Sequence, residues 1–374
     1  MIKKLIIENL KSIQNAELEI GHLNVFTGVN GSGKSTILQS LLLMRQSFLS
    51  GNLFRKPFSL NLGSSDNLAN LGTYRDVLCQ NALKENEKIG ILIEFNNIKL
   101  RFISENYNTE NRDSIILPGQ MNQRISLFTN HSLFSERFQY LAAERIQPNE
   151  DYPRFQSNEC LGKQGEFTAH FIEKHKNDDI PIKALSLLEK PVSFSLISQV
   201  NDWMGVISDS IEVIVKENLN TNRVELSYRF KFEDGIPTQT QKPQNVGFGV
   251  THTLPIVVAI LSAKPNDIII IENPETHLHP KGQSTLSHLF ALAAQNNVQL
   301  FIETHSDHIL NGMRVAVKKS LIDKDLIFLY YFSKTNKNIS EIKRIHVHSE
   351  GGLDCWPPGF FDQATKDLNY LFGI

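Results

Sequence analysis

The sequence predicts an α/β protein with a mostly parallel sheet that helices cover on both faces. In residues 244–335, apolar strand-like runs such as DIIIIE (267–272) and VQLFIE (298–303) alternate with stretches of helical period. Continuous β-branched runs between helices are typical of parallel strands that are buried on both faces. A glycine-rich turn between the strand-like run LNVFTG and a helical stretch, near the N-terminus, predicts the same class.

Composition narrows the class of protein further. The 374 residues are 41% hydrophobic and 21% charged, with a formal net charge of −2, which excludes a generally basic nucleic-acid coat. The three cysteines, Cys79, Cys160 and Cys355, form no CxxC pair, so neither a disulfide framework nor a structural zinc site is indicated. No N-terminal signal peptide is recognisable, and the longest apolar stretch is too short to span a membrane. We therefore expect a soluble, cytoplasmic protein without a membrane partner.

The clearly patterned strand and helix segments lie at the two ends of the chain, so we expect a lobe that is split by an insertion. Within the insertion, residues 88–107 and 211–232 read as β-hairpins, and helical stretches are expected near 164–176 and 182–206. The poor periodicity of residues 108–200 predicts an inserted α+β subdomain. The expected segments are an N-terminal half-lobe with antiparallel strands (1–77), the insertion (78–240), a C-terminal half-lobe (241–335) and a short C-terminal segment (336–374).

Residues Gly28 to Ser35 read GVNGSGKS and satisfy the phosphate-loop pattern GxxxxGK[ST] between a strand and a helix. Glycines let the backbone wrap around phosphates, so that its N–H groups and the helix N-terminus face negative charge. Lys34 is expected to hold the β- and γ-phosphates, and the Ser35 hydroxyl to ligate Mg²⁺. The sequence thus predicts ATP and Mg²⁺ as ligands. The expected nucleotide-binding residues of this loop are Asn30, Gly31, Ser32, Gly33, Lys34, Ser35 and Thr36.

Four further segments, NVGFGVTH, IIIIENPE, THLHP and ETHSDHIL, follow in the order signature loop, acidic strand end, D-loop and switch histidine. In this order the chain resembles the ATP-binding-cassette (ABC) type of P-loop ATPase, and within it the stand-alone bacterial AAA ATPases of the RecF, SMC and OLD kind. With its closing GGLDCWPPGFF it looks most like the branch that carries a DUF3696 segment. The resemblance covers residues 1–45 and 243–363.

This resemblance implies a head-to-tail homodimer in which ATP lies between the phosphate loop of one protomer and the signature loop of the other. Gly247 and Gly249 would allow a close approach of the backbone to the nucleotide. The usual Leu-Ser-Gly-Gly-Gln signature is absent, so Asn245 and Thr251 are both candidates to replace its serine. The alternative interpretation is an ordinary loop before a core helix.

The acidic strand end departs from the pattern of the family, in which Asp-Glu bind magnesium through water and polarise the attacking water. Here Glu272 and Asn273 take these places, and an amide can orient a water but cannot accept its proton. Three carboxylates are candidates for the missing base: Glu272 itself, Glu275 and Glu303. We predict slow ATP hydrolysis with Glu303 as a possible substitute base, the alternative being a structural hydrogen bond at a strand end.

Histidines gather around the same segments. The resemblance makes His305 the switch histidine at the γ-phosphate; a structural histidine at a strand end is the alternative. A metal cluster of His277, His279, His305, Asp307 and His308 is conceivable but lacks a recognisable ligand spacing. Two basic groups could contact phosphates, although solvated helix faces explain them equally well. They are Arg137, Arg145 and Arg154, and Arg314, Lys318, Lys319 and Lys324.

Neither an acidic metal-binding nuclease domain nor long coiled-coil heptads are recognisable, so the sequence predicts an ATP-gated module without an output of its own. The leading hypothesis is an ATP-dependent dimerising sensor that acts with a separate effector, such as a nuclease, in prokaryotic anti-phage defence. This last step is an analogy with the family. The alternatives are a RecF-like DNA-binding ATPase in DNA repair and a non-hydrolysing, nucleotide-dependent scaffold.

Overall fold

The computed structural model of the protein describes residues 1–63, 68–82, 88–104, 113–118, 128–155, 160–218, 220–231 and 238–372. Two compact units divide the chain. Unit 1 comprises residues 1–136, 327–348 and 352–374, and unit 2 comprises residues 137–326 and 349–351. The predicted insertion of residues 78–240 is thus shared between the two units, with the division at residue 136.

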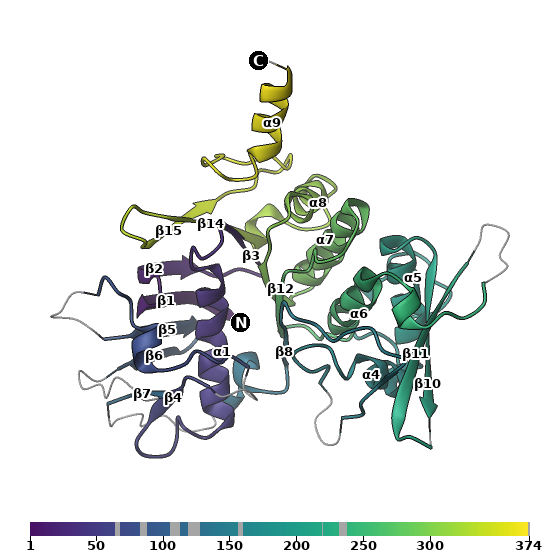
Figure 1. The fold of residues 1–374 in the computed structure, drawn as a ribbon, viewed down its shortest axis with the longest axis horizontal. Helices are drawn as coiled ribbons and strands as arrows, with labels where there is room; N and C mark the ends of the chain where they lie inside the picture. Colours follow the sequence, from purple (N-terminus) through teal and green to yellow (C-terminus); the bar gives the residue numbers. More distant parts are fainter. Residues whose placement is uncertain are drawn as a thin grey trace. The chain divides into compact units, whose positions relative to one another are not determined.

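Unit 1 contains an antiparallel sheet in the order β2-β1-β5-β6, and β14, which pairs in parallel with β3 and antiparallel with β15 (Figure 1). The alternating burial of β1 is that of a sheet with one covered face. The strands are β1 (Ile2–Leu10), β2 (Ile13–Glu19), β3 (Leu23–Gly28), β4 (Ser59–Asn61), β5 (Gly90–Phe95), β6 (Lys99–Ile103), β7 (Ser114–Ile116), β14 (Ile327–Lys334) and β15 (Ser340–Ile345). The helices are α1 (Lys34–Leu49), α2 (Tyr74–Val77), α9 (Gln363–Phe372) and the 3₁₀ turn η1 (Ser132–Phe134).

Unit 2 is built on three parallel strands in the order β13-β12-β8 and on a separate sheet in the order β10-β11-β9. Helices α4 and α5 lie beside this second sheet (Figure 1). The strands are β8 (Phe138–Leu141), β9 (Asp151–Tyr152), β10 (Ile211–Asn218), β11 (Arg223–Phe230), β12 (Ile268–Glu272) and β13 (Gln299–Glu303). The helices are α4 (Thr168–His175), α5 (Leu196–Ile207), α6 (Phe248–Leu261), α7 (Pro280–Gln295) and α8 (Asp307–Lys318), with 3₁₀ turns η2 (Lys183–Leu185), η3 (Pro243–Asn245) and η4 (Lys324–Leu326).

Both predicted hairpins are confirmed over their described residues, as the antiparallel pairs β5–β6 and β10–β11. The expected α/β class, with an antiparallel N-terminal part and buried parallel strands, is also confirmed. The helix expected near 182–206 is wrong in its first half, because α5 begins only after Ser195. Pro191 explains this late start, since proline has no N–H group and disfavours a helical conformation in the residue before it.

Candidate functional site

The phosphate loop of unit 1 joins β3 to α1 and requires glycine at three positions. Gly28, Gly31 and Gly33 have φ values of 139°, 71° and 103°, which L-residues with a side chain rarely adopt. Gly28 also lies directly against β14, because a methyl group on it would be 2.0 Å from the carbonyl oxygen of Phe332. The predicted pattern therefore has the backbone geometry that wraps a loop around a small central space.

Lys34, the first residue of α1, turns its ammonium group back to this loop. Its Nζ donates to the carbonyl oxygens of Gly28, at 3.0 Å, and Val29, at 2.9 Å. The loop is closed from the other side by Ser32, whose Oγ also donates to Val29 O. An ammonium group and the positive end of a helix dipole thus meet at one turn, and these donors fit a phosphate chain.

The remaining predicted residues of the loop differ in exposure. Asn30 and Gly31 are exposed and Ser35 is half-buried, whereas Thr36 is buried and its N–H donates to Gly33 O at 3.1 Å. The loop thus presents its first half to solvent and packs its second half into unit 1.

In unit 2, Glu272 and Glu303 end the neighbouring parallel strands β12 and β13 and are direct partners in the register. Partners in a parallel register project to the same face of the sheet. Both charges act on the hydroxyl of Tyr140 on β8: burial raises the pKa of this phenol, and the carboxylates of Glu272 and Glu303 raise it further. The ends of three parallel strands therefore bring two carboxylates and a tyrosine together, at the edge where α/β proteins bind ligands.

Segment 140–145 holds Glu272 in place. The Tyr140 hydroxyl donates to Oε1 of Glu272 at 3.2 Å, and the N–H of Ala143 donates to Oε2 at 3.1 Å. Burial nevertheless raises the pKa of the Glu272 carboxyl group above its ordinary value, because loss of hydration outweighs these two donors. Glu272 is thus a fixed, partly desolvated carboxylate.

Asn273, which replaces the expected glutamate, is also fixed by its main chain. Its φ is 45°, in the left-handed region that asparagine tolerates, and its N–H donates to Glu303 O at 2.9 Å. Within the described ranges, its buried Oδ1 has no hydrogen-bond partner. A buried amide oxygen without a donor is costly, and a water or ligand that donates to it would relieve this cost.

Glu275 connects the segment after β12 to the segment after β13. Its carboxylate accepts from the Thr304 hydroxyl at 2.8 Å and from the N–H of His305 at 2.7 Å. The His305 side chain is exposed, while Glu303 is only 6% exposed. The three candidate carboxylates, Glu272, Glu275 and Glu303, therefore lie at one edge of the sheet.

Arg145 lies beside the end of β12, although the sequence analysis grouped it with cations of solvated faces. It is 2% exposed, and its guanidinium donates to the main-chain oxygens of Glu272, at 2.6 Å, and Asn273, at 3.3 Å. Burial lowers its pKa to about 10, against the opposite effect of Glu275 and Glu272. The available signal was its position just after the strand-like run FQYL, at the edge where parallel strands end.

The predicted signature loop separates into exposed and buried residues. Asn245 in η3 and Gly247 before α6 are exposed, and a methyl group on Gly247 would meet no atom within 4 Å. Gly249 is required by packing, since a methyl group there would lie 2.3 Å from the carbonyl oxygen of His277. Thr251 is buried and its hydroxyl lies 3.4 Å from that of Tyr228, so of the two candidates for the signature serine Asn245 is the exposed one.

The histidines do not assemble into a metal centre in the part of the chain that the structure describes, where no three His, Cys, Asp or Glu side chains are grouped for it. The side chain of His279 instead caps α7 by accepting a hydrogen bond from the N–H of Lys281. Nε2 of His308 lies 3.7 Å from Oδ1 of Asp307. His277 packs against the rings of His252 and Phe248, close to the signature loop.

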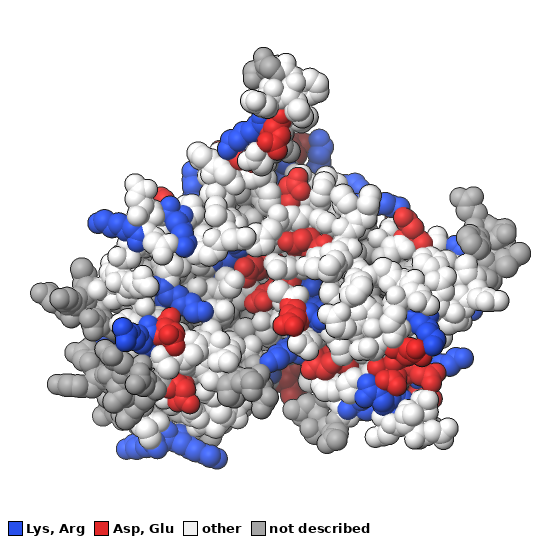
Figure 2. All heavy atoms as spheres, viewed as in Figure 1, with Lys and Arg blue, Asp and Glu red and all other residues white. Residues whose placement is uncertain are grey.

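Most of the basic residues that could have contacted phosphates are engaged by neighbouring carboxylates. Arg137 pairs with Asp267, Lys318 with Glu350 and Lys324 with Asp325. Basic and acidic side chains lie side by side over β9 to β11, as Figure 2 shows for one face. These three cations therefore have carboxylate partners on the protein itself.

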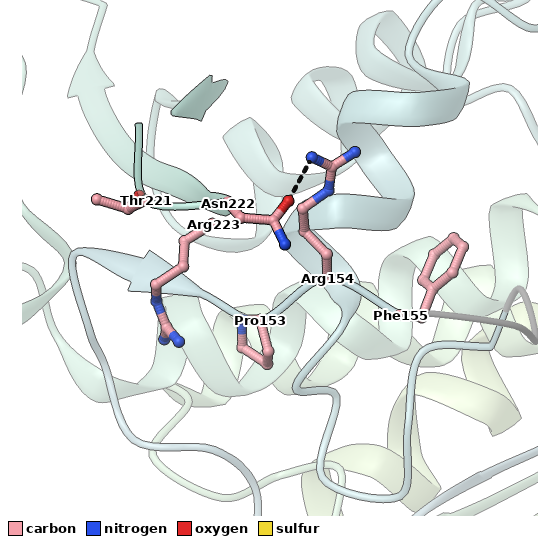
Figure 3. A pocket seen from close by; sticks show the side chains of 6 residues that line it. All are labelled: Pro153, Arg154, Phe155, Thr221, Asn222 and Arg223. Carbon is pink, nitrogen blue, oxygen red and sulfur yellow. Dashed lines mark hydrogen bonds between the residues drawn. The ribbon is translucent and has the colours of Figure 1, made fainter. Parts of the chain in front are cut away.

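A pocket of about 420 Å³ in unit 2 lies between the segment after β9 and the tip of the β10–β11 hairpin (Figure 3). Arg154 donates there to Oδ1 of Asn222 at 2.9 Å and pairs with Glu217, and Arg223 pairs with Asp151. The two guanidinium groups point away from each other (Figure 3). The pocket residues are Pro153, Arg154, Phe155, Thr221, Asn222 and Arg223.

Among the residues that the structure describes, no helix has the length and apolar character needed to cross a bilayer.

Comparison with known families gives two matches along the chain. The family described as "AAA domain, putative AbiEii toxin, Type IV TA system" matches residues 23–311. A second family, "Protein of unknown function (DUF3696)", matches residues 322–371. No curated protein matches the chain significantly. The resemblance predicted from the motifs is thereby confirmed, including its C-terminal segment.

Solved structures of SMC head domains share the fold. One, an SMC head bound to the C-terminal winged-helix domain of ScpA, is 14% identical and has a TM-score of 0.54, covering 93% of this chain and 98% of that one. Another, from Pyrococcus furiosus, with an extended coiled coil and bound to the C-terminal domain of ScpA, is 12% identical with a TM-score of 0.50, covering 99% of both chains. At these identities the likeness is one of fold, and the fold is that of ABC-type ATPase heads.

Proposed function

Because the chain belongs to the AAA-domain family that matches residues 23–311 and ends in a DUF3696 segment, we propose that it is an ATP-binding protein that hydrolyses ATP slowly. The observation that carries this proposal is the phosphate loop. Its three glycines with positive φ place the Lys34 ammonium group inside the turn, at the N-terminus of α1. A buried ammonium group at the N-terminus of α1 fits the negative charge of a phosphate chain.

The residues of this chain have separate tasks in the proposed reaction. Lys34 and the N–H groups of residues 30–36 bind the phosphates, and Ser35 and Glu272 hold Mg²⁺, Glu272 through a water. Magnesium, when bound, neutralises negative charge on the phosphate oxygens. The burial of Glu272 and its two hydrogen bonds keep its carboxylate in one orientation for this task.

We expect slow hydrolysis because Asn273, the residue after β12, has an amide in place of a carboxylate. The Asn273 amide orients a water by accepting from it through the buried Oδ1, but it takes no proton. Glu303 is the substitute base that we propose, because it is buried beside Glu272 in the strand register. His305, whose exposed side chain follows β13, is the proposed contact of the terminal phosphate. Phosphoryl transfer depends mostly on positioning and charge, so a weak base slows it without abolishing it.

ATP-dependent dimerisation is proposed from the signature loop. Gly247 is exposed, and its neighbours within the described chain leave room for a side chain, so its lack of one suits the close approach of a second molecule. Asn245, on the exposed turn before it, is the proposed polar contact with the nucleotide of the partner protomer. We expect a homodimer that ATP closes.

A separate effector protein is proposed as the output. Both SMC head structures contain a domain of a second protein, ScpA, bound to the head. The family that matches residues 23–311 is named for a putative AbiEii toxin of a type IV toxin–antitoxin system. By analogy with this family we propose a role in prokaryotic anti-phage defence. The sensor would report through such a partner, for example a nuclease.

Asn273 also favours a second candidate, a nucleotide-held scaffold that does not turn over. A test of both is sedimentation of the purified chain with no nucleotide, with Mg-ADP and with Mg-ATP, beside Lys34→Met. We expect a dimer only with ATP and only with Lys34 intact. A monomer under all conditions, with ATP shown to be bound, contradicts the proposed dimerisation, and an ATP dimer that never decays favours the scaffold.

A further inference from the structure

The phosphate loop rests on the β14–β15 hairpin, which comes from the far end of the sequence. Strand β14 pairs in parallel with β3, with Phe332 opposite Gly28. The N–H of Val29 donates to the carbonyl oxygen of Phe332 at 3.2 Å. The carboxyl ends of β3 and β14 thus lie at the same edge of unit 1, and the residues that end β14 lie beside the loop.

The last residue of β14 is a second lysine at this loop. A methyl group on Gly31 would lie 3.5 Å from Nζ and 3.9 Å from Cε of Lys334. The Lys334 side chain is exposed, and its ammonium group donates to Oδ1 of Asn338 at 2.5 Å. Asn338 sits in the tight β14–β15 turn with φ 60°, so the turn holds the lysine over the exposed first half of the loop.

The start of β15 fixes the other side of the loop. A methyl group on Gly33 would lie 2.5 Å from Oγ of Ser340 and 3.0 Å from Oγ of Ser12. These two hydroxyl groups are 2.7 Å apart, and the N–H of Ser340 donates to Ser12 O at 2.8 Å. The hairpin therefore touches the loop at Gly28, Gly31 and Gly33, which makes the position of Lys334 a consequence of the fold.

We propose that Lys334, beside Gly31, is a second cationic contact of the phosphate chain that donates to phosphate oxygens in addition to the buried Lys34. This inference rests on the proposed function of the loop and adds a residue that the phosphate-loop pattern does not contain. An exposed ammonium group near the open side of a glycine loop binds a polyphosphate without the desolvation cost of a buried one. The bond to Asn338 positions the lysine and is exchanged for the phosphate.

The test is equilibrium binding of Mg-ATP, Mg-ADP and adenosine to the full chain, for the wild type, Lys34→Met, Lys334→Met, Lys334→Arg and Lys343→Met. Lys343 is the matched control, because it is an exposed lysine on β15 of the same hairpin, opposite Tyr331 and away from the loop contacts. We expect Lys334→Met to weaken the binding of both Mg-ATP and Mg-ADP roughly 5- to 10-fold, as for the loss of one exposed charge-assisted contact. Lys334→Arg retains affinity within about 2-fold, and Lys343→Met binds like the wild type.

A merely structural role of Lys334 has a different signature. It would lower the melting temperature of the nucleotide-free protein, and Asn338→Gly, which removes the amide and tolerates the φ of 60°, would lower it equally; we expect neither change. If Lys34→Met weakens ATP binding while Lys334→Met binds like Lys343→Met, the inference is overturned and the proposed function stands. If the wild-type chain binds neither nucleotide, the proposed function and the inference both fall.

Discussion

The guanidinium of Arg145 donates to the main-chain oxygen of Glu272 over 2.6 Å, which ties the segment after β8 to the end of β12. It makes a second bond to the oxygen of Asn273, so one buried cation fixes both residues of the acidic strand end. This arrangement explains why Glu272 and Asn273 keep their positions at a point where the chain leaves the sheet.

Replacement of Arg145 by methionine should destabilise the protein by about 2–4 kcal/mol, because it leaves two buried carbonyl oxygens without their donor and removes a cation near two carboxylates. Arg137→Met is the matched control, since the Arg137–Asp267 pair is partly exposed and should cost about 1 kcal/mol or less. Urea unfolding at pH 7 measures both. Equal losses in the two variants would contradict the structural role of Arg145.

Replacement by alanine should affect protein stability at one glycine of the signature loop and dimerisation at the other. Gly249→Ala places a methyl group 2.3 Å from the carbonyl oxygen of His277 and should cost about 1–3 kcal/mol of stability. Gly247→Ala meets no atom within 4 Å and should leave thermal unfolding unchanged, yet weaken the ATP-dependent dimer. Normal dimerisation of Gly247→Ala would exclude Gly247 from the proposed interface.

Asn273→Asp should raise the rate of ATP turnover at least about 10-fold, since it restores a proton acceptor where the amide offers none. Aspartate tolerates the left-handed backbone at this position. Asn266→Asp provides the control, because Asn266 precedes β12 and also has a positive φ, of 71°. A turnover of Asn273→Asp equal to that of the wild type would show that proton transfer does not limit the rate.

His252 should make the stability of the protein fall with acidification. Burial, followed by the charges of Arg145 and His277, lowers the pKa of His252 to about 4 from its ordinary 6.5. Between these values the unfolded chain binds a proton that the folded chain does not. Its contribution, on the order of 2–3 kcal/mol, is therefore complete above pH 6.5 and is lost as the pH falls to about 4.

His252→Phe keeps an aromatic side chain but removes the ionisable imidazole. The stability of this variant should therefore depend less on pH between about 4 and 6.5. The measurement is the denaturation midpoint at pH 7 and at pH 5, for the wild type and the variant. If the denaturation midpoint falls from pH 7 to pH 5 by the same amount in His252→Phe as in the wild type, groups other than His252 cause the acid sensitivity.

The sequence predicted those parts of the molecule in which local pattern decides structure. The glycines of the phosphate loop, the apolar runs of β12 and β13 and the two hairpins each carry their signal within a few residues. The burial of Arg145 could not be predicted in this way, because it depends on a tertiary neighbour, Glu272, that no local pattern contains. The choice between Asn245 and Thr251 stayed open for the same reason, since the burial of Thr251 beside Tyr228 is also tertiary.

The position of Lys334 beside the phosphate loop was not predicted from the sequence, for a related reason. Lys334 joins the phosphate loop only through the pairing of β14 with β3, two strands at opposite ends of the chain. Non-local strand pairing leaves no signature in a window of sequence. The start of α5 was placed too early because apolar periodicity continues through residues 182–195, while Pro191 prevents the helix there.

The most direct test is the steady-state rate of ATP hydrolysis by the purified chain, with Lys34→Ala as the background and Glu303→Gln as the probe of the base, alongside ATP binding by each variant. We predict slow turnover above the Lys34→Ala level, its loss in Glu303→Gln, and ATP binding that Glu303→Gln retains. A wild-type chain that neither binds ATP nor exceeds the Lys34→Ala rate would show that this chain is not an ATPase.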